Sequence, residues 1–300
     1  MSISISAIIP TYNKPALLRR AIDSVLAQTR PAEELIVVDD GSTDETEAVV
    51  QRDYGDRVRY IRQENAGTAA ARNRGVREAR GEWLSFLDHD DEWLPRRLEL
   101  HSEAIAADPE TALVYSSFYV TGHSEAARRI LAPAPPSELL YPGVLLENLL
   151  PTPAMSIRKD VYLAMGGFNE SLRGSCEDWD LLVRITRCHR ATRISEPLLV
   201  AHEQASSQSR RYLTMLEREL SIVETTLLDS FTGWRRLVWR NRILAAIYAR
   251  AAVGARESGA SGLPYLGKSF IYWPLPEPLT GRSRLKTMAA DIRDRIAGRV

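Results

Sequence analysis

The sequence predicts an α/β fold with a mainly parallel sheet flanked by helices and a helical extension at the C-terminus. Short β-rich runs alternate with helix-like segments over the first hundred or so residues, which is typical of βαβ units. Polar clusters follow three of these runs, at 10–13, 39–41 and 88–91. Ligands of such sheets bind beyond the carboxyl ends of the strands, so these clusters mark the expected site.

Hydrophobic periodicity and helix-capping signals predict the elements of the first hundred residues. Apolar β-rich runs predict strands at 3–9, 35–38, 58–61 and 83–87. Apolar residues at helical spacing predict a helix over 17–26, and an Ala/Arg-rich segment predicts another over 66–79. Ser42 and Glu45 have the spacing of a capping box, so a helix is expected to begin at Ser42.

The remaining elements are less regular. We expect strands at 112–119, 154–157 and 198–202, a loop at 132–136, a helix over 178–188 and a Ser/Gln-rich loop at 203–209. Amphipathic patterns predict helices over 213–228, 234–252 and 285–296, with flexible breaks at 254–264 and 274–278. The predicted domains are therefore a catalytic part, 1–209, with halves 1–110 and 111–209, and a mainly helical part, 210–300.

Composition limits the class of protein. The chain has 300 residues, 44% of them hydrophobic, and 39 basic against 39 acidic side chains, which is ordinary globular composition. Zero net charge argues against nucleic-acid binding, but residues 1–209 carry −8 and residues 210–300 carry +8. Cys176 and Cys188 are expected to be free thiols. Without a signal peptide or an apolar run of about 18 residues, the protein is predicted to be cytoplasmic.

Asp88, Asp90 and Asp91 gather three carboxylates at the end of an apolar strand. Mg²⁺ and Mn²⁺ prefer carboxylate oxygens and share their other positions with phosphates and water. The cluster therefore suits a cation bridging to a nucleoside diphosphate, with a solvated acidic turn as the alternative.

Asp39 and Asp40 end a neighbouring strand, where a carboxylate could accept a hydrogen bond from a base N–H or a ribose hydroxyl. Capping of the following helix is the alternative. Tyr12 could stack on a base, and Thr11 and Asn13 could hydrogen-bond to it.

Four further residues have two interpretations each. Arg72 could neutralise a phosphate, although arginine is also common on solvated helix faces. Glu177 and Asp178 lie at an expected helix start, where capping competes with a general base that takes a proton from a hydroxyl. His202 ends a strand and could bind a metal or a phosphate, although a lone histidine is more often structural.

Several segments, taken in chain order, match the motifs of one known family: 7–13, 37–44, 65–67 with 71–73, 86–91, 166–170 and 177–180. Over residues 3–209 the chain resembles the family 2 glycosyltransferases. The resemblance implies a GT-A fold and inverting transfer from a nucleotide-activated sugar, assisted by Mn²⁺ or Mg²⁺. UDP is the default nucleotide, with thymidine or guanosine nucleotides as alternatives.

The resemblance also implies roles for individual residues. The nucleotide would be bound by Pro10, Thr11, Tyr12, Asn13, Asp39, Asp40, Arg72 and Asp88. The metal would be held by Asp88, Asp90 and His202, with His202 near the diphosphate. Asp178 would be the catalytic base, and the acceptor site would be shaped by Glu177, Trp179 and the Gly166–Gly167 pair.

The acceptor is expected to be a saccharide or a lipid-linked hydroxyl, as in surface polysaccharide or cell-envelope glycan synthesis. Gly233–Arg236 is not the Gln-x-x-Arg-Trp motif of processive members, so single-sugar addition is expected. A non-catalytic nucleotide-sugar-binding module and a sugar-nucleotide pyrophosphorylase are the rival functions.

The basic C-terminal region lies outside the resemblance. It could pack on the catalytic part, form an oligomer contact such as a homodimer, or bind the inner face of the cell membrane as a peripheral patch. The last hypothesis rests on aromatic residues among many arginines, namely Trp234, Trp239, Tyr248, Phe270, Tyr272 and Trp273.

Overall fold

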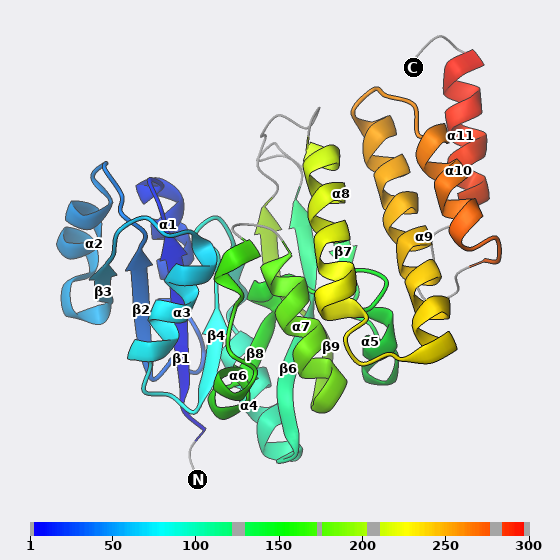
Figure 1. Ribbon diagram of the computed structural model, residues 1–300. Coiled ribbons are helices and arrows are strands. Elements are labelled where there is room, and N and C mark those ends of the chain that lie inside the picture. The colour runs from blue at the N-terminus through cyan, green and yellow to red at the C-terminus, as the bar shows by residue number, and fades with distance from the viewer. Residues whose placement is uncertain (1–2, 122–129, 173–175, 203–210, 277–283, 297–300) are drawn as a thin grey trace. The chain divides into compact units, whose positions relative to one another are not determined.

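The computed structural model describes residues 3–121, 130–172, 176–202, 211–276 and 284–296. The described residues fall into two compact units (Figure 1). The first lies within Met1–Glu138 and Leu149–Gln204, and the second within Leu139–Asn148 and Ala205–Val300. Residues 139–148 thus group with the C-terminal helices, and the domain boundary near residue 209 stays a prediction.

The first unit alternates strands and helices. Its strands are β1 (Ile5–Thr11), β2 (Glu34–Asp39), β3 (Arg59–Arg62), β4 (Trp83–Phe86), β5 (Glu92–Trp93), β6 (Thr111–Thr121), β7 (Ile130–Ala132), β8 (Met155–Arg158) and β9 (Arg190–His202). Its helices are α1 (Pro15–Leu26), α2 (Thr46–Tyr54), α3 (Thr68–Glu78), α4 (Arg97–Ala107), α6 (Lys159–Ala164) and α7 (Glu177–Cys188), and α5 (Ser137–Gly143) crosses into the second unit.

One sheet of nine described strands organises this unit. Its order is β3-β2-β1-β4-β8-β6-β9-β5, and β7 pairs with β6. The first four strands are parallel, as are β6 and β9, whereas β8 is antiparallel to both β4 and β6. The expected mainly parallel α/β sheet flanked by helices is confirmed, with the antiparallel pairs confined to the part beyond β4.

Helices cover both faces of the parallel strands. Alternate residues of β1, such as Ala7 and Ile9, share a buried cluster with Leu18 and Ile22 of α1. The intervening Ile8 points to the other face, where α3 lies against β1 and β2. A Cβ at Gly75 of α3 would come within 2.5 Å of Ile8 Cγ2, so α3 packs close to the sheet because Gly75 lacks a side chain.

The strand register brings the expected polar clusters to one edge. Thr11 pairs with Asp39, and Ile8 pairs with Phe86, so β1, β2 and β4 end side by side. The backbone N–H of Asp40 donates to Thr11 O at 2.9 Å, which ties the first two clusters together just beyond the strands.

The second unit is helical, as predicted. Its described helices are α8 (Arg211–Ile222) with a π-helical turn (Val223–Leu227), α9 (Gly233–Glu257), α10 (Leu263–Tyr272) and α11 (Arg284–Ile296). Arg250 of α9 pairs with Glu219 of α8 at 3.0 Å, and Ser269 Oγ of α10 donates to Ala245 O at 2.7 Å. No helix among the described residues combines the length and the hydropathy that crossing a membrane requires.

Three local predictions were wrong. The Ser42 capping box does not form: α2 begins at Thr46, and Asp44 accepts the Thr46 N–H at 3.0 Å instead. Ala132 belongs to strand β7 and not to a loop, because it pairs with Phe118. Gly254 lies inside α9 and not in a break, where a Cβ would come within 2.8 Å of Tyr212. The predicted break at 274–278 and loop at 203–209 lie partly or wholly outside the described residues.

Because α3 depends on close approach at Gly75, we expect Gly75→Ala to lower the free energy of unfolding by about 1–3 kcal/mol, despite the higher helix propensity of alanine. Urea unfolding measures this. Gly267→Ala is the matched control, because nothing lies within 4 Å of a Cβ there, and it should raise stability by up to about 1 kcal/mol. Equal stability of Gly75→Ala and the parent chain would contradict the packing argument.

Candidate active site

Arg72 lies at the centre of the polar edge. Helix α3 carries it, and its side chain is only 5% exposed. One guanidinium nitrogen, Nη2, lies 2.6 Å from Asp88 Oδ1, and the other, Nη1, lies 3.7 Å from Glu177 Oε1. The guanidinium also lies over the Phe168 ring, 5.1 Å from its centroid. A buried guanidinium needs partners of this kind, since an unpaired buried charge is costly.

The pKa shifts show that four charged side chains form one electrostatic cluster. Burial lowers the pKa of Arg72. The negative charges of Asp88, Glu177 and Asp178 raise it by more than burial lowers it, so the net shift is upward. Burial raises the pKa of Glu177, and Asp178 and Asp88 add to the rise, while Arg72 opposes it. Glu177 is 6% exposed, and its Oε2 has no hydrogen-bond partner among the described residues.

Asp178 lies in the first turn of α7, where its Oδ1 accepts the N–H of Trp179 at 2.7 Å. The residue before this helix, Cys176, has a left-handed backbone with φ of +64°. Non-glycine residues adopt this conformation at a cost of about 1–3 kcal/mol. The strained turn sets the direction in which Glu177 and Asp178 enter the site.

The acidic loop after β4 has the donor chemistry of a divalent-cation site. Asp88 and Asp90 are half-buried, and burial together with their negative charges raises the pKa of the buried Asp91 well above its ordinary value. A bound cation would offset this repulsion, so the carboxylates fit Mg²⁺ or Mn²⁺. Within the part of the chain that the structure describes, no three His, Cys, Asp or Glu side chains are placed to hold a metal together. Ligands beyond Asp88 and Asp90 would then be phosphate oxygens and water.

The carboxylates at the end of β2 hold the surrounding loops. Asp39 accepts from Ser42 N at 2.8 Å and from the Tyr60 hydroxyl. Asp40 accepts from Gln63 Nε2 at 2.7 Å, Ala66 N at 2.9 Å and Gly67 N at 2.8 Å. Both carboxylates are buried, and the sequence showed none of these partners.

The loop after β1 lies against the loop after β2. Asn13 N donates to Ser42 Oγ at 2.9 Å, so Ser42 holds this loop. Thr11 Oγ1 is buried without a hydrogen-bond partner among the described residues, and the neighbouring Tyr12 is 44% exposed. An orphaned hydroxyl beside an exposed aromatic ring suits a polar, planar ligand such as a nucleobase.

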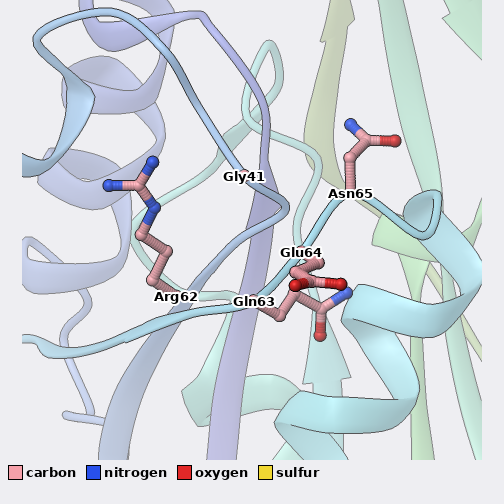
Figure 2. Close-up of a pocket in the computed structure, with 5 residues that line it drawn as sticks. All are labelled: Gly41, Arg62, Gln63, Glu64 and Asn65. Carbon is pink, nitrogen blue, oxygen red and sulfur yellow. The ribbon is translucent and has the colours of Figure 1, made fainter.

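An open hollow of about 520 Å³ lies between the β2 and β3 ends, lined by Gly41, Arg62, Gln63, Glu64 and Asn65 (Figure 2). Gly41 has φ of +83°, and a Cβ there would come within 3.0 Å of Asn65 N. Only glycine allows both this conformation and the close approach of the two loops.

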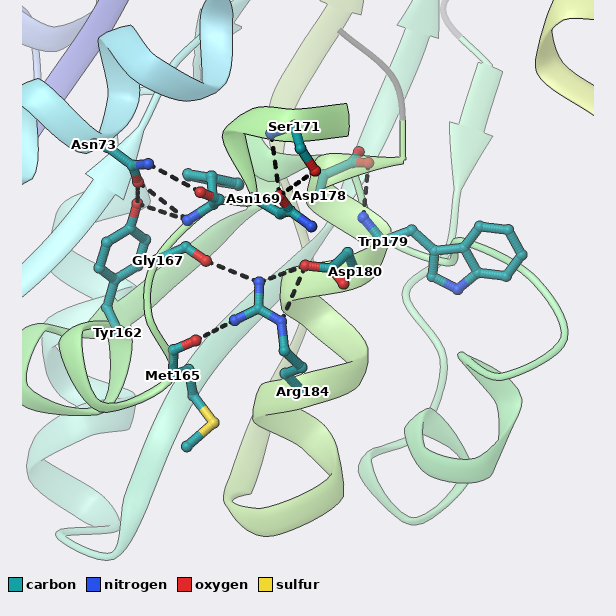
Figure 3. A network of polar contacts seen from close by, with 11 residues as sticks. Asn73, Tyr162, Met165, Gly167, Asn169, Ser171, Asp178, Trp179, Asp180 and Arg184 are labelled. Atoms are coloured by element: carbon teal, nitrogen blue, oxygen red, sulfur yellow. Dashed lines mark hydrogen bonds and ion pairs between the residues drawn. The ribbon is translucent and has the colours of Figure 1, made fainter. Parts of the chain in front are cut away.

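A polar network fixes the Gly166–Gly167 loop (Figure 3). Asn73 Nδ2 donates to Phe168 O at 2.9 Å and to Glu170 Oε1 at 2.8 Å, and Asn73 Oδ1 accepts from Phe168 N at 3.0 Å. Arg184 of α7 donates to Gly167 O at 2.8 Å. Sequence reasoning assigned no role to Asn73 or Arg184, although Asn73 directly follows Arg72 in the motif that it singled out.

Two predicted residues have other neighbours. The ring nitrogens of His202 contact Thr121 and Glu92: one lies 2.9 Å from Thr121 Oγ1 and the other 2.7 Å from Glu92 Oε1. The backbone N–H of His202 donates to Asp91 Oδ1 at 3.0 Å. Trp179 points to the opposite side of α7 from the Gly167 loop (Figure 3).

The α/β sheet agrees with the comparisons with known proteins. The model for glycosyl transferase family 2 matches residues 6–162, more than half of the chain. The chain belongs to this family. An uncharacterized glycosyltransferase of Haemophilus influenzae is 34% identical over 211 residues, which are 68% of this chain and 71% of that protein. One of Rickettsia felis is 32% identical over 76% of this chain, but the match spans only 38% of that longer protein.

The fold is also similar to that of a solved structure. TarS 1-349 of S. aureus, in complex with UDP-GlcNAc, superposes with a TM-score of 0.63 at 17% identity, covering 97% of this chain and 89% of that one. At this identity the likeness shows the GT-A fold. The family match and the fold together identify the chain as a glycosyltransferase with a GT-A fold.

The buried Glu177 predicts a pH dependence of stability. Its folded pKa lies above the ordinary value of 4.5, so the folded state holds the proton more tightly than the unfolded chain. Its contribution to the free energy of unfolding is fully present below pH 4.5 and falls as the pH rises through the folded pKa.

Glu177→Gln should therefore lose less stability than the parent chain between pH 4.5 and pH 7, as measured by urea unfolding at both values. The difference between the two proteins isolates Glu177 from other titrating groups. Parallel pH profiles would show that Glu177 ionises as it does in water.

Proposed function

We propose that the chain transfers one sugar from a UDP-sugar to a hydroxyl of a saccharide or lipid-linked acceptor, with inversion, in the synthesis of a surface or envelope glycan. The observation that carries the proposal is the cluster of Arg72 with Asp88, Glu177 and Asp178. In this cluster the Arg72 guanidinium lies beside Asp88 of the acidic loop, and the half-buried Asp178 carboxylate is close enough to raise the pKa of Arg72. A departing diphosphate and an incoming hydroxyl need these two kinds of group.

The donor nucleotide would lie along the ends of β1 and β2, against Pro10, Thr11, Tyr12, Asn13, Asp39 and Asp40. The orphaned Thr11 hydroxyl and the exposed Tyr12 ring support this placement. Each carboxylate oxygen has two lone pairs, so Asp39 and Asp40 can accept from the nucleotide while they hold their loops. The UDP-GlcNAc complex of TarS, which shares the fold, supports UDP as the carrier.

Asp88 and Asp90 would hold Mn²⁺ or Mg²⁺, which supplies positive charge to the diphosphate when bound. Arg72 adds a fixed positive charge at the same place. The ring nitrogens of His202 already face Thr121 and Glu92, so the proposal leaves His202 outside the set of metal ligands.

In the transfer, Asp178 accepts the proton of the acceptor hydroxyl as its oxygen forms the bond to the sugar C1. The bond from C1 to the diphosphate oxygen breaks, and the nucleoside diphosphate leaves with its electron pair. Glu177 and Gly167 would shape the acceptor side, whereas Trp179 is buried and points away from the Gly167 loop, so the proposal leaves it out of that role. The network of Asn73 and Arg184 holds the Gly167 loop in place for that role.

Two rivals predict different products. A non-catalytic binding module would neither transfer the sugar nor hydrolyse the donor. A pyrophosphorylase would release pyrophosphate from a nucleoside triphosphate and a sugar phosphate. Incubation of the full chain with UDP-sugars and Mn²⁺, with and without pyrophosphate, followed by analysis for UDP and UTP, separates the three functions. A transferase releases UDP, a pyrophosphorylase forms UTP from added pyrophosphate, and a binding module forms neither.

Asp178→Asn should lower the rate of sugar transfer by about 10²–10⁴-fold, the usual effect of one general base. Binding of UDP, followed by calorimetry, should not change, because Asp178 does not face the nucleotide in this proposal. Asp160→Asn is the control, since Asp160 is an exposed aspartate of the same unit with a 69% exposed side chain. Full turnover by Asp178→Asn would remove the base assignment.

UDP with Mn²⁺ should stabilise the chain by roughly 2.7 kcal/mol at about 100 times its dissociation constant, as measured by thermal shift. Asp90→Asn should lose the part of the shift that needs the metal and keep the part seen with EDTA. GDP, dTDP and CDP serve as comparisons for the base. A metal-independent shift in the parent chain would argue against a cation at Asp88 and Asp90.

A further inference from the structure

The second unit exposes a group of large apolar side chains, here called the α9 end patch. Its members are Trp234 and Leu237 of α9, Ile271 of α10, Leu275 just after it and Leu285 of α11. Their exposed fractions are 74%, 60%, 81%, 58% and 63%. Soluble proteins expose single apolar side chains often, but a gathered set marks an interaction surface.

Contacts between the helices place the end of α10 and the start of α11, which carry Ile271, Leu275 and Leu285, beside the middle of α9. The rings of Tyr248 and Tyr272 are stacked 5.6 Å apart, and Arg242 lies 5.9 Å from the Trp273 ring centroid. Arg284 donates to the carbonyls of Trp273 and Leu275. The last turn of α10 and the first turn of α11 therefore lie beside the middle of α9, and Trp234 and Leu237 lie on the first turns of α9, beyond the end of α10 (Figure 1).

The patch continues a packed helix face. Residues 234, 238, 241, 245, 248 and 252 follow one stripe of α9 at helical spacing. Helix α10 covers the stripe at Ala252, Ala245 and Tyr248, which meet Gly262, Ser269 and Tyr272. Because α10 ends at Tyr272, the part of the stripe that contains Trp234 is left exposed.

The charge around the patch is positive. Four arginines lie within eight residues of α9, at 235, 236, 240 and 242, and Lys286 lies beside Leu285. Glu224 pairs with both Arg236 and Arg240, at 2.8 Å and 2.9 Å, so one carboxylate serves two guanidinium groups. An exposed tryptophan among arginines suits the boundary between lipid headgroups and acyl chains, and basic side chains attract anionic lipids.

We propose that the α9 end patch docks on the surface of an anionic lipid bilayer. A second copy of the chain fits less well, because a symmetric contact would bring these arginines against the same arginines. The structure also selects among the aromatic residues that sequence analysis named. Tyr248, Tyr272, Trp239 and Phe270 pack within the unit or beneath arginines, and Trp234 is the one that inserts. The inference does not depend on the proposed sugar transfer.

Flotation of the full chain with vesicles tests the proposal. We expect binding to vesicles that contain phosphatidylglycerol, weaker binding as salt is raised, and none to pure phosphatidylcholine. The double variant Trp234→Ser/Leu237→Ser should bind at least about tenfold more weakly, since a buried tryptophan contributes more than a factor of ten. Arg235→Gln should weaken binding about fivefold.

Matched controls keep the result specific. Met215→Ser removes an exposed apolar side chain of α8 in the same unit, 48% exposed, and should bind as the parent does. Circular dichroism and urea unfolding report whether each variant is folded. Absence of binding to anionic vesicles, equal binding to neutral ones, or unchanged binding by the double variant would overturn the proposal. Concentration-dependent self-association that the double variant abolishes would assign the patch to a second copy instead.

Discussion

The buried guanidinium of Arg72 is the interaction on which the site depends. Its partners come from three separate segments: Asp88 after β4, Glu177 at the start of α7, and the Phe168 ring beside the Gly167 loop. A charge removed from water must keep such partners, so the pairing draws these segments together. The same pairing leaves one positive group among a surplus of carboxylates, an arrangement to which the proposed metal and diphosphate would add charges of both signs.

Arg72 can keep these partners because contacts on two sides fix the position of α3. Gly75 lets the helix approach β1, and Asn73 uses both ends of its amide to grip the loop around Phe168. Thus neighbouring positions on one helix contact the sheet, the acidic loop after β4 and the loop around Phe168. Arg184 completes the arrangement from α7, where it joins Gly167 to Asp180.

Periodicity and the polar clusters were enough to predict the fold class and the sheet edge at which the polar clusters meet, because both follow from local patterns. The partners were not predictable. Asn73 and Glu170 meet across 97 positions of sequence, and no local signal pairs them. Ser42 shows the opposite error: a correct local motif was overruled, since tertiary contact with Asn13 and Asp39 uses its hydroxyl and its N–H. Asp40 likewise has three loop partners that spacing alone does not reveal.

The unsatisfied atoms of the first unit indicate where stability has been given up. Thr11 Oγ1 and Glu177 Oε2 are both buried without partners among the described residues, and each such group costs about 1–3 kcal/mol. Cys176 adds a left-handed backbone next to Glu177. These two atoms and the Cys176 turn lie at the carboxyl edge of the parallel strands and at the start of the helix that carries Asp178, although buried atoms without partners also occur elsewhere among the described residues, as at His101 and Ser116. A ligand that donates hydrogen bonds to these oxygens would recover part of that free energy, so binding and local stability at this edge are coupled.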